Sequence, residues 1–95
     1  MNIDFQSTVI MRHPNTQFRE VGDEIYLVHP DGEQIYNLNP MAAALWRLSG
    51  EPMTMADMAE IVQAAFPILS QNKVEADVKA VITELLNLGF ATTKR

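Results

Sequence analysis

The chain of 95 residues contains no cysteine and only four glycines. Without cysteine, a disulfide framework, a thiolate nucleophile and a cysteine-based zinc site are all excluded. Four glycines leave little material for a phosphate-binding loop. No apolar run approaches the roughly 18–20 residues of a membrane-spanning helix, and the N-terminal stretch MNIDFQSTVIMRH lacks the pattern of a signal peptide. We therefore expect a soluble, cytoplasmic protein.

Basic residues are also scarce, because seven Lys and Arg stand against twelve Asp and Glu, for a net charge of -5. Proteins that bind nucleic acid draw much of their affinity from clustered Lys and Arg, so we expect no nucleic-acid partner. Several acids gather early in the chain. The simpler interpretation is that they lie on the solvated edge of a hairpin, and the alternative is a negative surface that attracts a basic peptide or protein. These acids are Glu20, Asp23, Glu24, Asp31 and Glu33.

Residues suited to catalysis are few. Only His13 and His29 can act as general bases near neutral pH, and they lie 16 positions apart outside any catalytic motif. No spacing of His, Asp and Glu is typical of a metal site. We expect a protein that is not an enzyme and that holds neither a cofactor nor a metal ion.

The first part of the chain predicts a three-stranded antiparallel meander over residues 17–38. Its strands are Gln17–Val21, Glu24–His29 and Gln34–Leu38, which are rich in β-branched and aromatic residues. The turns between them are Gly22-Asp23 and Pro30-Asp31-Gly32, both of which have the residue types of tight turns.

The remainder, over residues 40–90, predicts three helices. Asn39-Pro40 begins the first helix and Gly50 ends it. Thr54, with Asp57 three residues later, is close to a capping box for the second helix, which Pro67 ends.

The third helix is expected to begin near Lys73, with Asn72 as its cap and Glu75 reaching back, and to end at Gly89. Its apolar residues recur at helical spacing and form an inward stripe: Val74, Val78, Val81, Ile82, Leu85 and Leu88. A further short strand is expected at Ser7–Met11, and residues 90–92 are expected either to return and pack on the fold or to add another short strand.

Taken together, these elements predict an α+β fold of the winged helix-turn-helix type. A three-stranded antiparallel sheet is followed by three helices, in the order βββααα. One domain covers residues 17–92, with a partly extended N-terminal lead at residues 1–16 and a tail at residues 93–95. We expect Trp46, in the middle of the first helix, to lie in the core.

At this point the sequence resembles the PqqD-like family. The run EIYLVHPDGEQIYNLNPMAAALW has that family's strand, turn, strand ending in Leu-Asn and helix with a central Trp. The stretch from Gly50 is similar to its G-x-P-T helix start. The resemblance covers about residues 17–91, and the chain departs from the common pattern at Asn37 and in its long N-terminal lead.

The end of the chain continues the likeness. Asp77-Val78, Glu84-Leu85 and Gly89-Phe90 resemble the closing D-V…L-x-x-x-G-[LF] pattern of the family. No single piece is specific, but the order and spacing of the pieces are those of the family.

The resemblance implies a RiPP recognition element. Such proteins bind the leader segment of a ribosomally made precursor peptide and present it to a modifying enzyme, often a radical SAM enzyme, and they hold no cofactor. The leader docks as a strand antiparallel to the third strand, in a cleft walled by the third helix. The expected partners are thus a precursor leader peptide and a modifying enzyme, with no membrane.

Strand addition requires an open edge whose backbone groups are free, and Gln34–Leu38 contains no proline that would remove a donor. On the third helix, Ile82 and Leu86 widen one flank of the apolar stripe, with Lys79 and Glu75 beyond them. A peptide groove would explain this width, and so would the packing of the helix on two neighbours. Whether Ile35 or Tyr36 faces the cleft stays open. The predicted peptide-binding residues are Gln34, Ile35, Tyr36, Asn37, Leu38, Lys79, Ile82 and Leu86.

Two other functions compete with this one. A winged-helix DNA-binding regulator would share the fold, but the acids of the predicted helices oppose phosphate binding. A general protein–protein adaptor would use the same strand edge and groove. The edge also leaves a homodimer open.

Overall fold

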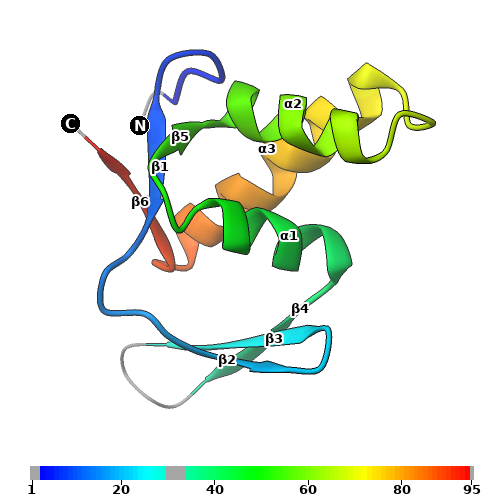
Figure 1. Ribbon diagram of the computed structural model, residues 1–95. Coiled ribbons are helices and arrows are strands. Elements are labelled where there is room, and N and C mark those ends of the chain that lie inside the picture. The colour runs from blue at the N-terminus through cyan, green and yellow to red at the C-terminus, as the bar shows by residue number, and fades with distance from the viewer. Residues whose placement is uncertain (1–2, 30–33, 95) are drawn as a thin grey trace.

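The computed structural model describes residues 3–29 and 34–94. The strands are β1 (Val9–Arg12), β2 (Gln17–Val21), β3 (Glu24–Val28), β4 (Ile35–Leu38), β5 (Met53–Thr54) and β6 (Ala91–Lys94), and the helices are α1 (Pro40–Leu48), α2 (Met55–Ala65) and α3 (Gln71–Asn87). Figure 1 shows the helices above a meander of β2, β3 and β4, with β1 and β6 standing at one side. The turn predicted at Pro30-Asp31-Gly32 lies outside the described residues.

The meander is antiparallel in the order β2-β3-β4, as the sequence predicts. Gly22, between β2 and β3, has a φ of 62°, a left-handed conformation that glycine adopts without steric cost. In β3 the alternation of side chains is regular, because Ile25 and Leu27 are fully buried while Tyr26 and Val28 are half-buried on the opposite face. One face of this sheet therefore packs against the helices.

A second small sheet joins both ends of the chain, in the order β5-β1-β6. The strands expected at Ser7–Met11 and at residues 90–92 form as β1 and β6, each shifted toward the C-terminus. They pair with each other, with Ile10 opposite Thr93. The sequence analysis missed β5, a two-residue strand that pairs with β1. Ile10 is fully buried, so the N-terminal lead contributes to the hydrophobic core.

The first two helices begin as their capping residues predict. The Oδ1 of Asn39 accepts a hydrogen bond from the backbone N–H of Ala42 at 2.8 Å. Thr54 and Asp57 form a complete capping box, in which each side chain accepts from the backbone N–H of the other. These bonds satisfy amides that have no partner inside the helix.

The predicted start of α3 is wrong. The helix begins at Gln71 with Ser70 as its cap, and the Ser70 Oγ accepts from the N–H of Lys73 at 3.2 Å. Serine caps a helix as well as asparagine does, and Ser70 lies in extended backbone directly after the turn that follows α2. Glu75 does not reach back to the cap and accepts a hydrogen bond from Gln71 instead.

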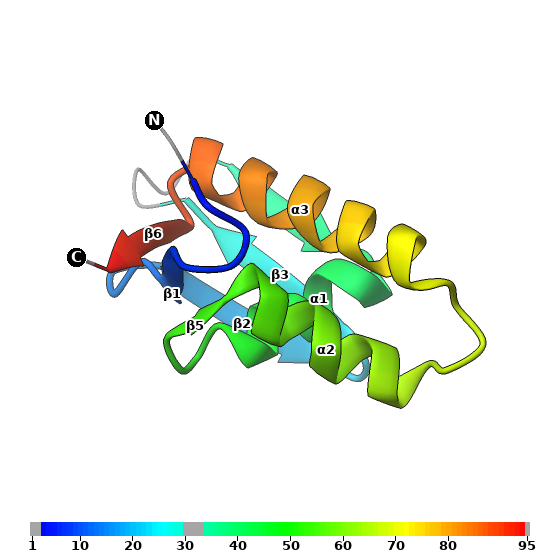
Figure 2. The ribbon, with the colours of Figure 1, turned by 90° about the horizontal axis from the view of Figure 1, so that it is seen from above.

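The core joins both sheets to the helices. Trp46 is fully buried, as expected, and so is Phe90, which follows the left-handed Gly89 (φ 83°) at the end of α3. Figure 2 shows α2 and α3 side by side, and Figure 1 shows α1 between them and the meander. In the parts of the chain that the structure describes, no helix is both long and apolar enough to cross a membrane.

Candidate functional site

Strand β4 is an edge of the meander, with β3 as its neighbour in the sheet. The N–H of His29 donates to the carbonyl of Gln34, directly opposite it in the register, at 3.0 Å. In an antiparallel ladder, hydrogen-bonded and non-bonded pairs alternate. The backbone groups of Ile35 and Asn37 therefore point away from β3, toward the open edge.

The side chains of β4 divide between two faces. Tyr36 is half-buried, and its ring packs edge-on against Phe90 at a centroid distance of 5.1 Å. Leu38 is buried on the same face, whereas Ile35 is 68% exposed on the other. The structure thus settles a point that the sequence left open: Tyr36, and not Ile35, faces the helices.

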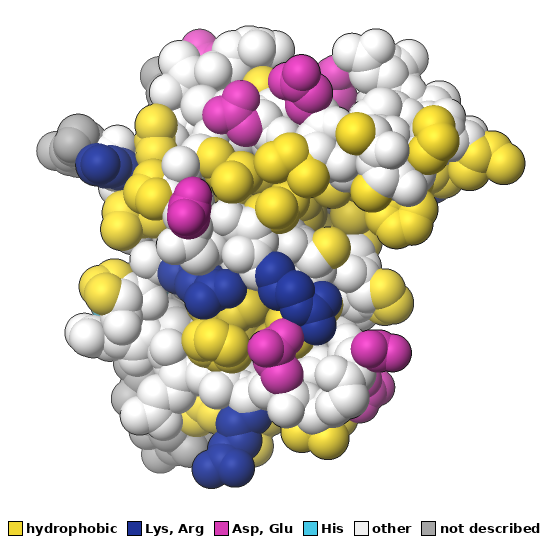
Figure 3. All heavy atoms as spheres, viewed as in Figure 1, with side chains coloured by type: hydrophobic (Ala, Val, Ile, Leu, Met, Phe, Trp, Pro, Cys, Tyr) yellow, Lys and Arg dark blue, Asp and Glu magenta, His cyan; other side chains and the backbone are white. Residues whose placement is uncertain are grey.

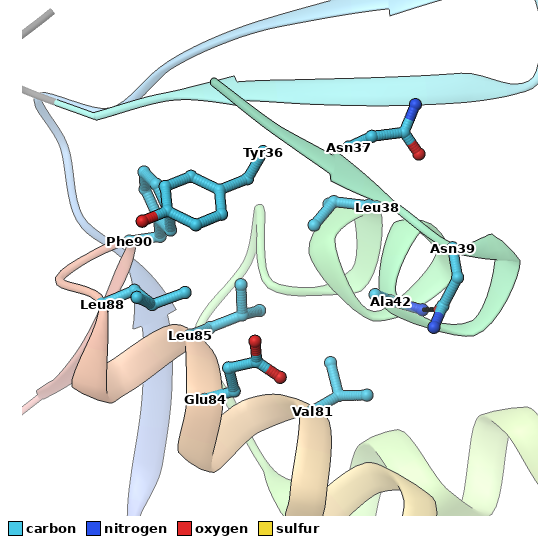
Figure 4. A pocket seen from close by; sticks show the side chains of 10 residues that line it. All are labelled: Tyr36, Asn37, Leu38, Asn39, Ala42, Val81, Glu84, Leu85, Leu88 and Phe90. Carbon is cyan, nitrogen blue, oxygen red and sulfur yellow. Dashed lines mark hydrogen bonds between the residues drawn. The ribbon is translucent and has the colours of Figure 1, made fainter. Parts of the chain in front are cut away.

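A cavity of about 140 Å³ lies between β4 and α3 (Figure 4). Helix α3 contributes Val81, Glu84 and Leu85, and its C-cap residue Leu88 continues the same face. Tyr36 and Leu38 of β4, Ala42 of α1 and Phe90 form much of the remaining wall. A cavity of about 150 Å³ can hold benzene, so this pocket has room for one side chain of about that size.

Polar groups share the lining of this pocket with apolar ones. The Asn39 side chain is occupied in capping α1, and Asn37 is exposed at the rim. Glu84 is the only charged side chain among the ten lining residues. The pocket therefore has a mixed lining, in which Glu84 supplies the single carboxylate.

The β4 half of the predicted site comes together in the structure. Gln34, Ile35, Tyr36, Asn37 and Leu38 all lie along the open edge. Of these, Tyr36, Asn37 and Leu38 line the pocket.

The α3 half of the prediction does not come together with β4. Ile82 is fully buried in the core, and Leu86 lines a different cavity, with Ile3 and Thr83. Lys79 is exposed and lies roughly 200° around the helix from Val81, away from the pocket.

The reason is how α3 is oriented in the fold. It packs against α2 and α1 and buries the stripe of Val74, Val78, Ile82 and Leu85. Such a stripe has two flanks, and the sequence analysis chose the one that carries Leu86. The flank that faces β4 carries Val81, Glu84 and Leu88 instead. Only the position of β4 beside Phe90 distinguishes the two.

At the other edge of the meander, beside β2, side chains of the protein itself pack over the strand. The Arg12 guanidinium lies over the rings of Phe18 and Trp46 and donates through Nε to the Trp46 carbonyl at 3.0 Å. Burial lowers the pKa of Arg12, which the charge of Glu20 partly offsets. Glu20 also pairs with Arg47 at 2.9 Å. Figure 3 shows basic side chains gathered on this face, below a band of hydrophobic side chains.

The histidines have local contacts. The N–H of Asn15 donates to the His13 ring, and the His29 ring packs edge-on against Phe90. Within the described ranges, no three His, Asp or Glu side chains lie close enough together to hold a metal ion.

Comparison with known proteins yields two matches. The model of the family described as "Coenzyme PQQ synthesis protein D (PqqD)" matches residues 24–91. A solved structure, "TbiB1 in Complex with the TbiA(beta) Leader Peptide", is similar with a TM-score of 0.78 and 16% sequence identity, over 90% of this chain and 98% of that chain. No curated protein sequence matches. The structural likeness confirms the predicted α+β fold.

Proposed function

This chain belongs to the PqqD family, and from that premise we propose that it binds the leader segment of a ribosomally made precursor peptide and presents it to a modifying enzyme. The observation that carries the proposal is the open edge of β4 beside a pocket for one side chain. The similar structure TbiB1 is in complex with a leader peptide, which supports a peptide as the ligand here.

Binding begins with the backbone. The leader adds as a strand antiparallel to β4 and pairs with the outward N–H and C=O groups of Ile35 and Asn37. Because these bonds involve main chain alone, they supply affinity with little demand on the sequence of the leader.

Selection comes from the pocket. Alternate side chains of an added strand point to the same face of the sheet, so one leader side chain enters the space between Tyr36, Leu85 and Phe90. Burying a Val, Leu, Ile or Phe side chain contributes about 1.5–3 kcal/mol, which is roughly ten- to hundredfold in affinity. A leader with an apolar anchor is therefore preferred over a polar one.

The chain would act by presentation and not by catalysis. It would hold the leader while a separate enzyme, of which radical SAM enzymes are one class, modifies the rest of the peptide. A cytoplasmic location suits that role, because the precursor is made there.

Amide NMR spectra of the labelled protein test this proposal. The ligand is the leader half of the short peptide encoded beside the gene, and a DNA duplex at low salt is the control. We expect shifts at residues 34–38 and at the α3 face from Val81 to Leu88, with no response to DNA. Shifts in α2 or α3 on adding DNA, with the peptide silent, would identify a winged-helix DNA-binding protein instead.

A further inference from the structure

Glu84 is a charged group in an otherwise uncharged pocket. It belongs to the exposed flank of α3, and its carboxylate lies on the side of the helix that faces the pocket (Figure 4). Within residues 3–29 and 34–94, no Lys, Arg or His forms an ion pair with it. The carboxylate is thus available to a ligand at the mouth of the pocket.

Cations of the surrounding surface are engaged or directed elsewhere. Arg12 and Arg47 lie on the β2 side of the meander, over aromatic rings and against Glu20. On α3 itself, Lys73 pairs with Asp77 at 3.3 Å. Lys79 lies on the far flank of the helix. Among the residues that line the pocket between β4 and α3, the one formal charge is therefore that of Glu84.

We infer that the peptide held in this groove carries a Lys or Arg that pairs with Glu84, beside the apolar residue that fills the pocket. This inference rests on the proposed function and specifies its ligand. The carboxylate of Glu84 is not needed for the packing of the fold, so it is free to serve in the choice of ligand.

Strand geometry gives the spacing. Residues i and i+2 of an extended chain lie on one face, roughly 6.6–6.8 Å apart. If the anchor enters between Tyr36 and Leu85, the next side chain on the same face passes along α3. A Lys or Arg there can lay its aliphatic stem on Val81 or Leu88 and bring its cationic end to Glu84. We therefore expect the basic residue two positions from the anchor.

The ion pair between Glu84 and the basic residue contributes more to the choice among peptides than to the overall affinity. Charge-assisted hydrogen bonds in a partly enclosed groove are stronger than those at an open surface, and opposed like charges suppress wrong partners. We expect about a three- to tenfold preference for the basic peptide over its neutral counterpart, and a larger preference over an acidic one.

Selection from a displayed library of random peptides tests the inference. The full-length protein is immobilised as the wild type, as Glu84→Lys and as Glu75→Lys. Glu75 is a matched control because it lies on the same helix, on the side opposite Glu84. Bound peptides are eluted and sequenced.

The wild type and Glu75→Lys should enrich Lys or Arg two positions from an apolar residue. Glu84→Lys should lose that preference and enrich Asp or Glu at the same position. Far-UV circular dichroism and the fluorescence of Trp46 check that each protein is folded. Glu84→Gln, which adds no positive charge, should lose the preference without gaining the acidic one.

One selected peptide and its Lys→Glu variant are then measured by isothermal titration against the wild type and Glu84→Lys. Restored affinity in the charge-swapped pair would establish the contact directly. Wild-type peptides with no basic preference, or with one that survives Glu84→Lys, would overturn the inference and leave the proposed function intact. Failure of the wild type to select any peptide would overturn both.

Discussion

The meander has two open edges, β2 and β4, and they differ in what lies beside them. Both leave backbone groups without a neighbour strand. Alternation along the ladder directs those of Phe18 and Glu20 outward at β2, and those of Ile35 and Asn37 outward at β4. In hydrogen-bonding capacity, the two edges are equivalent.

Beside β2, the protein fills the space with its own side chains. The Phe18 ring packs edge-on against Trp46 at 5.6 Å, and the Arg12 guanidinium covers both rings. Arg47 reaches across from α1 to Glu20. Charged residues on an edge strand also discourage pairing with other chains.

Beside β4, the packing leaves room. The Tyr36 ring packs against Phe90, and a pocket of about 140 Å³ separates β4 from α3. An open edge accepts any extended chain, whereas an open edge beside a pocket can choose among them. Both strands can therefore offer backbone hydrogen bonds to a peptide, but only β4 also has a pocket that can favour one peptide sequence over another.

The largest expected effect concerns the aromatic ring that supports each edge. Phe90→Ala removes a fully buried side chain and should lower the free energy of unfolding by about 3–5 kcal/mol. Phe18→Ala should cost clearly less, because that ring is 40% exposed. Urea denaturation followed by Trp46 fluorescence measures both, and equal losses would show that the two edges are supported alike.

The next effect concerns the pocket. Val81→Phe places a larger side chain on the α3 wall and should weaken leader binding roughly ten- to hundredfold by occupying the space of the anchor. Leu86→Phe makes a comparable change on the other flank of α3 and should leave binding within about twofold. Isothermal titration with the leader peptide decides, and a larger loss in Leu86→Phe would restore the flank that the sequence analysis chose.

A smaller effect on leader binding should distinguish the backbone of β4 from that of β2. Ile35→Pro removes an outward N–H from β4 without breaking a bond to β3, and should weaken leader binding by about tenfold. Glu20→Pro removes the matching group from β2 and should leave affinity unchanged. Fluorescence anisotropy of a labelled leader provides the comparison, and similar losses in the two variants would place the peptide on both edges.

The smallest effect is expected at the ion pair that covers β2. Arg47 and Glu20 are each about half exposed, and surface pairs of this kind contribute about 0.2–1 kcal/mol. Arg47→Met should therefore change the free energy of unfolding by less than about 1 kcal/mol and should not alter leader binding. Thermal unfolding at low and high salt checks this, and a loss of several kcal/mol would make the pair essential to the fold.

Much of the architecture could be predicted because it depends on neighbours in the sequence. Asn39, Thr54 with Asp57, Gly22 and Gly89 each act within a few residues, and each behaves as predicted. The start of α3 could not be decided in this way, because Ser70 and Asn72 are both good caps.

In the candidate site, too, one part could be predicted from the sequence and the other could not. The order of the strands predicted that β4 would be an edge, and its composition showed that it contains no proline. The partner face on α3 did not, since a helical stripe has two flanks and periodicity treats them alike. The fold places Val81, Glu84 and Leu88 toward β4, and Leu86 toward Ile3 and β6.

By itself, the sequence determined the class of fold, the caps of α1 and α2, the turn at Gly22 and the identity of the edge strand, because short-range hydrogen bonds and side-chain alternation set all of these. The tertiary structure alone decided that Tyr36 faces inward, that α3 turns Glu84 toward the groove and that the chain ends pair as a second sheet. Those outcomes depend on contacts between residues far apart in the chain, which no local pattern records.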